Sequence, residues 1–506
     1  MTIYLPISDF LYELFPEAKG KGDDALVAAI RASYTHGDAA PEVVVRDGMV
    51  EVTVNFHKAS GNAADLQRAI GLCERGDYAR ARPILQQLAE RDPSNSEVHR
   101  ILGQISSDEG NQDAAIDHLI DALRWDPKNQ YALTMMGNIW AKHRDDIDTA
   151  MKYYEQALVA DPDDHVAANN IGTNMLQLRK YDEAQRWFDR AMSINASYPN
   201  TRFGLSILCE QRGDLTSAFN EAIEAMKLNP RRDELAKQSF AQAGSIARKL
   251  IALGKGSEIV DRFAQELEAS SGKKILLEVD RHIPTAAKLE VAENYDREEH
   301  VVRFKPDYPN VEHLQAHELF HLKFIVEARA ANANMLFVSR KKHREAFIRS
   351  LEKHVTKLNQ MGYGEETLAN YLTALYEGIT RQVHNAPIDL FIEQGIHDDF
   401  PEMRPYQFQS LWALLGEALH ATTEPSIVEL TPPSVLSKSK TFNLLLAYQF
   451  KELYGVDMTA AFKASAAERT MADRFYAEFV EYRSDREGGE EYEVVDHWGH
   501  DLQLEA

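Results

Sequence analysis

Apolar and small residues recur between residues 60 and 230 with a period close to 34 positions. Each period ends on aspartate or asparagine followed by proline, and these pairs stand at Asp92-Pro93, Asp126-Pro127, Asp161-Pro162 and Asn229-Pro230. The first three prolines lie 34 and 35 residues apart, and the fourth follows after two more periods, with Ala196 at the intermediate position. Because proline lacks a backbone N–H and clashes with the preceding turn, each pair predicts the end of a helix.

Small residues hold fixed positions inside these units. In the first predicted helix a glycine recurs, at Gly103, Gly137 and Gly172. In the second helix an alanine recurs, at Ala81, Ala115, Ala150, Ala184 and Ala218. A large residue often marks the turn between the two helices, as at Tyr78, Tyr181 and Leu215. Small side chains let two helices approach closely, so the pattern predicts a stack of helix pairs.

The spacing and these recurring positions resemble the tetratricopeptide repeat, a helix–turn–helix unit of 34 residues. The resemblance covers about five units over roughly residues 60–230, and a helix near 232–253 is predicted to cap the last unit. It implies an α-solenoid whose concave surface binds a peptide or a partner protein.

Short runs of strand-forming residues lie on both sides of the repeats. Val43–Val54 predicts a β-hairpin that turns at Asp47-Gly48. Strands are also predicted at 274–279, 289–292 and 300–304, the last two as a pair. Four parts are therefore predicted: a small α/β segment over 1–58, the repeat array over 59–254, a second domain over 258–484 that follows a boundary at Gly254–Ser257, and an acidic, loosely held tail over 485–506.

A zinc-binding motif stands inside a predicted helix of the second domain. His317-Glu318-Leu319-Phe320-His321 places two histidines four residues apart, and Pro309 and Asn310 mark the start of the helix. Residues i and i+4 share one face of a helix, so both imidazoles can bind one zinc ion. Glu318, beside the first histidine, is the candidate general base for a zinc-bound water.

A catalytic zinc needs a third protein ligand, and the sequence leaves its identity open. No His-x-x-Gly-x-x-His pattern continues the motif, so a carboxylate from a later helix is expected. Pro387 is predicted to open a short helix that carries Asp389 and Glu393 on one face. We expect Glu393 to bind zinc and Asp389 to hydrogen-bond a ligand histidine. The reverse assignment and Glu377 are the alternatives.

The motif and a distal carboxylate resemble the zincin metallopeptidases, in particular the thermolysin-like gluzincins. The order of the two acidic residues departs from the E-x-x-x-D order more usual in that group, which puts the third ligand in doubt. The resemblance implies one zinc ion, an edge strand (289–292 or 301–304) that binds substrate, and a donor to the developing oxyanion. Candidate donors near the ligands are Tyr376, Arg381 and His384.

The implied fold class is mainly α: an α-solenoid of tetratricopeptide repeats followed by an α+β zincin-like domain with a small antiparallel sheet. The net charge of the chain makes two classes of partner less favourable. The 506 residues carry a formal charge of −23, which disfavours nucleic acid or an anionic membrane as a partner. No apolar run reaches membrane-spanning length, and the first residues show no signal-peptide pattern. Cys73 and Cys209 form no metal-type pair, so a cytoplasmic protein is expected.

Together these features predict an intracellular zinc metallopeptidase that hydrolyses peptide bonds, with a repeat array that recognises a protein or peptide, or regulates the enzyme. The first alternative is a non-catalytic adaptor, in which the repeats act and the metal site is structural or vestigial. The second is a zinc hydrolase of non-peptide amides.

Overall fold

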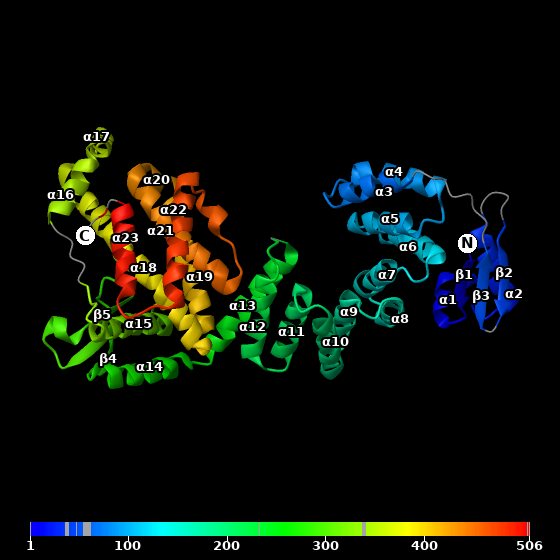
Figure 1. The fold of residues 1–506 in the computed structure, drawn as a ribbon, viewed down its shortest axis with the longest axis horizontal. Helices are drawn as coiled ribbons and strands as arrows, with labels where there is room; N and C mark the ends of the chain where they lie inside the picture. The colour runs from blue at the N-terminus through cyan, green and yellow to red at the C-terminus, as the bar shows by residue number, and fades with distance from the viewer. Residues whose placement is uncertain are drawn as a thin grey trace. The chain divides into compact units, whose positions relative to one another are not determined.

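The computed structural model describes residues 2–35, 40–46, 48–53, 62–231, 233–335, 341–502 and 504. The chain divides into two compact units, Met1–Leu208 and Cys209–Ala506 (Figure 1). Both are mainly helical, and each contains a three-stranded sheet. Among the described residues, no helix combines the length and the apolar character that a bilayer crossing requires.

The first unit opens with an antiparallel sheet in the order β1-β3-β2. Its strands are β1 (Thr2–Pro6), β2 (Glu42–Arg46) and β3 (Met49–Thr53). Val43 pairs with Val52, which confirms the predicted hairpin. Asp47 of the predicted turn and Val54 lie outside the described residues.

This sheet and its two helices, α1 (Asp9–Leu14) and α2 (Asp23–Tyr34), share a hydrophobic core with the repeat helices. The ring of Tyr34 meets Trp125 edge-on with centroids 4.9 Å apart, and Phe10 meets Tyr153 at 5.5 Å. The N-terminal α/β segment is therefore a packed part of the first unit.

The repeats form successive antiparallel helix pairs (Figure 1). Side-chain caps begin many of these helices, as where Asn95 and Asn111 each accept a hydrogen bond from a backbone N–H of the first turn. The helices are α3 (Asn62–Cys73), α4 (Tyr78–Arg91), α5 (Ser96–Asp108), α6 (Gln112–Trp125), α7 (Gln130–His143), α8 (Ile147–Ala160), α9 (His165–Gln177) and α10 (Tyr181–Ile194).

The recurring glycines lie where two helices of a pair meet. A Cβ built on Gly137 would lie 2.5 Å from the ring of Tyr154, and one on Gly172 would lie 2.8 Å from the ring of Phe188. The recurring alanines are fully buried in the same interfaces. The small-residue pattern thus reports close helix packing, as predicted from the sequence.

Gly137→Ala is expected to destabilise the first unit by about 1–3 kcal/mol, because the added methyl group overlaps the buried Tyr154 ring. Gly71→Ala in α3 is the matched control, since its Cβ would lie 3.8 Å from the guanidinium of Arg75, and a gain of about 0.4–1 kcal/mol is expected. Urea unfolding followed by circular dichroism measures both. Equal stability of the two variants would contradict the packing account.

The second unit begins inside the repeat array, after the division that falls within α11 (Pro199–Gln211). Its first helices are α12 (Leu215–Lys227), α13 (Glu234–Ala252) and α14 (Gly256–Ser271). The predicted capping helix is present as α13. Phe219 and Phe240 of α12 and α13 pack on Phe408 with centroids 5.9 and 5.6 Å apart.

The predicted boundary at Gly254–Ser257 does not separate compact units. Gly256 is buried at the start of α14, where its backbone N–H donates to the hydroxyl of Tyr406 at 2.9 Å. A side chain on Gly256 would overlap that ring, so this glycine permits a close approach and does not mark a flexible linker.

The second sheet is mixed, in the order β4-β6-β5. Its strands are β4 (Lys274–Val279), β5 (Ala287–Glu290) and β6 (Glu299–Phe304). β5 pairs antiparallel with β6 as predicted, but β4 pairs parallel with β6, so the prediction of an antiparallel sheet was wrong in this strand. β6 is the central strand, and β5 is therefore the edge strand of the predicted pair.

The rest of the second unit, where the structure describes it, is mainly helical. Its helices are α15 (Val311–Ala330), α16 (Lys341–Ser350), α17 (Glu352–Gln360), α18 (Glu365–Asp399), α19 (Arg404–Thr423), α20 (Pro425–Leu430), α21 (Pro433–Tyr454), α22 (Ala466–Ser484) and α23 (Glu490–Asp501). The core of this unit lies among α12–α15, α18, α19 and α21–α23.

The prediction of a loosely held acidic tail was wrong, because α23 packs into this core. Trp498 is fully buried and stacks on Phe475 with centroids 4.6 Å apart and an interplanar angle of 8°. Its indole N–H donates to Glu478 at 2.8 Å. The apolar residues Tyr492, Val495 and Trp498 recur at helical spacing, and the surrounding acidic residues hid that pattern.

Trp498→Ala is expected to destabilise the second unit by about 3–5 kcal/mol, because it empties a buried aromatic site. His497→Ala is the neighbouring control: its side chain is 52% exposed and pairs with the same Glu478. Its effect should stay below about 1 kcal/mol. Thermal unfolding measures both, and a harmless Trp498→Ala would restore the loose-tail interpretation.

Candidate metal centre

Two long helices position the predicted zinc motif. α15 begins after Asn310, as predicted, and carries His317 and His321 one turn apart, with ring centroids separated by 5.0 Å. α18 continues from Glu365 to Asp399, with Pro387 inside it. The prediction that Pro387 opens a short helix was wrong, because its fixed φ suits a helix and burial on both sides outweighs one missing hydrogen bond.

Three donor side chains converge between these helices. Oδ1 of Asp389 lies 3.3 Å from Nε2 of His317 and 3.7 Å from Nε2 of His321. Donor atoms of the three residues all fall within 4.8 Å of one another. Oδ1 of Asp389 is buried, and it has no hydrogen-bond partner in the described parts of the chain. Two imidazoles and one carboxylate with an unsatisfied buried oxygen match the donor set of a zinc site.

Glu393, the predicted ligand, lies on the opposite side of His317. Its Oε1 accepts from Nδ1 of His317 at 2.9 Å, whereas Asp389 faces Nε2. The structure therefore places the two acidic residues in the reverse of the favoured assignment, with Asp389 at the convergence point and Glu393 behind the histidine. Both acidic residues share a face of α18. The position of α18 along α15 determines which of them faces Nε2 of His317.

A buried network holds Glu393 in place. Its Oε2 accepts from Nε2 of His313 at 2.9 Å and from Nε2 of Gln407 at 2.7 Å. Gln407 also donates to the backbone carbonyl of Glu393 at 2.7 Å, and it accepts from the hydroxyl of Tyr454 at 2.7 Å. Metal-binding histidines commonly have such a carboxylate behind them, which sets the tautomer and the ring orientation.

The electrostatics of the site follow from this arrangement. Burial raises the pKa of Glu393, but the charges and hydrogen bonds of His313 and His317 outweigh it, so the pKa lies well below the ordinary value. Burial lowers the pKa of His317, but the neighbouring carboxylates of Asp389 and Glu393 raise it overall well above the usual value. Burial, then the nearby His317, lowers the pKa of His321. The Glu393 carboxylate therefore stays ionised next to a cation site.

Glu318, the predicted general base, points to the sheet. Its Oε2 accepts from the backbone N–H of Leu289 in β5 at 2.8 Å. Leu289 pairs with Val302 of β6, so this hydrogen bond joins α15 to the edge strand. The motif helix and the edge strand thus lie beside each other at the metal centre.

The other predicted site residues lie elsewhere on α18. Glu377 is exposed and precedes Asp389 by about 18 Å along the helix axis, at 1.5 Å per residue. Tyr376 and His384 line a pocket of 910 Å³ formed with α16, α21 and α23. Arg381 is exposed on the same stretch. The structure does not bring these four residues to the metal-binding cluster.

Sequence reasoning missed the supporting residues. From the sequence alone, His313 is a cleft-lining residue, a substrate contact or a solvated residue at the start of the helix, whereas in the structure it is fully buried against Glu393. Its position, one turn before His317, was a visible signal that the two share a face. Gln407 and Tyr454 carried no such signal, because they reach the site from α19 and α21.

Comparison with known proteins bears on the repeats. A family model of the tetratricopeptide repeat matches residues 72–139. The chain contains tetratricopeptide repeats. BBSome complex member BBS4 of Bos taurus is 27% identical over 161 residues, which is 32% of this chain and 31% of that protein. The type IV pilus assembly protein PilF of Pseudomonas aeruginosa is 23% identical over 150 residues, 29% of this chain and 58% of that one.

Among solved structures, PilW, a type IV pilus biogenesis factor, is similar with a TM-score of 0.32 and 18% identity. It covers 38% of this chain and 94% of its own. The chain thus spans about a third of the length of BBS4 and just over half of PilF. The family match lies within the first unit, whereas His317, His321 and Asp389 lie in the second.

Asp389→Asn is expected to remove one equivalent of bound zinc, because Asp389 faces both motif nitrogens. Glu393→Gln should keep the ion but weaken its binding by about 10- to 100-fold, as loss of a supporting carboxylate does. Elemental analysis after dialysis against zinc buffers measures both.

Asp398→Asn is the control, on the same helix with its side chain 57% exposed. It should bind zinc as the unmodified protein does. Loss of the ion in Glu393→Gln together with full retention in Asp389→Asn would return the ligand role to Glu393.

Proposed function

We propose that this protein is a zinc-dependent peptidase that engages protein substrates or partners through its tetratricopeptide repeats. One observation carries the enzymatic part. Both motif histidines direct Nε2 toward an unsatisfied buried oxygen of Asp389, while Glu393 holds Nδ1 of His317 from behind. Such a site presents three protein donors and leaves further positions for a water and a substrate.

In the proposed mechanism, metal binding and proton transfer are carried out by different residues. His317, His321 and Asp389 would hold the zinc ion, which when bound lowers the pKa of a coordinated water and polarises a peptide carbonyl. Glu318 would take a proton from that water on Oε1, since Oε2 accepts from Leu289, and would pass it to the leaving amine.

The edge strand supports the choice of a peptide as substrate. β5 has β6 on one side, and α15 with its motif lies beside it. An extended peptide binds such an edge by adding a strand, and its backbone then runs next to the metal centre. A small-molecule amide has no extended backbone that could pair with this edge strand.

The repeats support protein binding. Proteins with related repeats include a member of the BBSome complex and a pilus assembly protein, both of which are named for multi-protein assemblies. Stacked helix pairs present an extended surface that suits a peptide or a partner protein.

A non-catalytic adaptor is the second candidate, and one observation favours it. The Glu318 carboxylate already has a structural task, because it joins α15 to β5 through Leu289. In that case the metal ion would brace α15 against α18, and the repeats would carry the biological activity.

Glu318→Gln separates the two candidates. Glutamine keeps an oxygen that can accept from Leu289, so the fold and the zinc content should be unchanged, but it cannot take a proton. Turnover of a quenched fluorescent peptide library should fall by about 10²- to 10⁴-fold.

Glu312→Gln, on the same helix, is the matched control and should retain full activity. Equal cleavage by Glu318→Gln would refute the proposed mechanism. Zinc-loaded protein of native sequence that cleaves nothing in the library would leave the adaptor as the function.

A further inference from the structure

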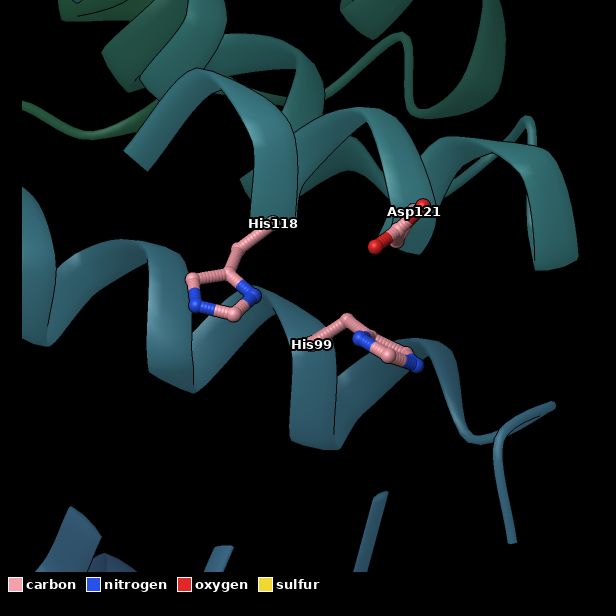
Figure 2. Close-up of side chains that lie close together, drawn as sticks. All are labelled: His99, His118 and Asp121. Carbon is pink, nitrogen blue, oxygen red and sulfur yellow. The ribbon is translucent and has the colours of Figure 1, made fainter. Parts of the chain in front are cut away.

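A second group of donor side chains lies in the first unit, within the pair formed by α5 and α6. His99 comes from α5, and His118 and Asp121 come from α6. One donor atom from each residue lies within 4.8 Å of the other two. Figure 2 shows a ring nitrogen of each histidine and one carboxylate oxygen of Asp121 turned toward the same space.

His99 is held in the orientation of a metal ligand. Its Nε2 lies 2.9 Å from the carbonyl oxygen of Pro93, and a carbonyl only accepts, so Nε2 carries the proton. Nδ1 is then the nitrogen with the lone pair. It is buried and has no hydrogen-bond partner in the described part of the chain. A histidine fixed by a backbone carbonyl, with its other nitrogen unsatisfied, is the usual arrangement around a bound transition metal.

The two helices are fixed to each other at this point. The hydroxyl of Ser96, at the start of α5, donates to the carbonyl of Ala122 in α6 at 2.8 Å. It also accepts from the side chain of Asn129 at 2.9 Å. Since His118 and Asp121 are three residues apart on α6, they share a face toward α5. The donors are thus positioned by packing that does not depend on an ion.

The chemistry of the group selects among cations. Two imidazoles favour zinc and neighbouring transition metals over magnesium and calcium, which prefer oxygen donors. Arg124 pairs with Oδ1 of Asp121 at 3.2 Å. The Asp121 side chain is 42% exposed, so solvent or a side chain of a bound protein can reach the group.

We propose that His99, His118 and Asp121 form a second zinc site, which lies in the repeat array and links α5 to α6. Three protein donors hold the ion, and a further position is open to water or to a ligand from a partner protein. This site is independent of the proposed peptidase activity and requires neither His317 nor Glu318.

Zinc alone is the probe, and the full chain with His317→Ala and His321→Ala is the background, because it lacks the motif histidines. Equilibrium dialysis of this background is expected to show one zinc ion bound saturably per chain. Adding Asp121→Asn or His118→Ala should weaken that binding at least tenfold. Magnesium at a hundredfold excess should not displace the ion.

His143→Ala in the same background is the matched control, since His143 is an exposed histidine of the neighbouring α7, and it should bind zinc unchanged. Circular dichroism checks the fold, and Asp121→Asn preserves the side-chain size if His118→Ala fails to fold.

A background that binds no zinc overturns the inference and leaves the peptidase proposal intact. Binding that survives Asp121→Asn and His118→Ala, or that His143→Ala weakens equally, also overturns it. Loss of peptide cleavage in Glu318→Gln has no bearing on this result.

Discussion

The arrangement of the candidate metal centre depends on the hydrogen bonds of the buried Glu393 carboxylate. An ionised carboxylate inside a protein is costly unless charged or hydrogen-bonding groups satisfy it. Here His313 and His317 of α15 and Gln407 of α19 all donate to it. Two of these donors come from α15 and one from α19, while Glu393 itself lies on α18, so one charge sets how these three helices meet. Replacing Glu393 with an apolar residue would leave His313, His317 and Gln407 without this hydrogen-bond acceptor.

The same region joins the metal centre to the end of the repeat array. Gln407 and Phe408 are neighbours on α19, yet Gln407 donates to Glu393 while Phe408 packs on Phe219 and Phe240. Since α12 and α13 share the core of the second unit, the last repeat is part of the scaffold that holds the metal-binding helices. Removal of residues 60–253 would therefore cut through that core. A truncation that tests the role of the repeats has to end before Cys209.

Local patterns in the sequence predicted much of the fold, and the places where they fell short have a common cause. The close packing at the repeat glycines and the motif helix could be predicted, because both follow from residue spacing within a single helix. Three features depend instead on how separate elements pack against one another. They are the parallel pairing of β4 with β6, the packing of α23, and the reversed roles of Asp389 and Glu393 at the candidate metal centre. The i,i+4 spacing correctly predicts that both acidic residues lie on one face of a helix. The position of α18 along α15 depends on tertiary packing, which no local sequence pattern predicts.

The two candidate zinc sites differ in what stands behind their histidines, and this difference has a chemical consequence. His317 has an ionised carboxylate at Nδ1, which increases the basicity of the imidazole and favours a strongly bound ion. His99 has a neutral carbonyl at Nε2, which fixes the orientation of the ring but adds no negative charge behind it, and Asp121 is partly exposed. The first arrangement suits a resident catalytic ion, and the second suits an ion that exchanges with solvent or with a partner. Of the two proposed sites, the one in the repeat array would therefore respond better to a change in zinc concentration.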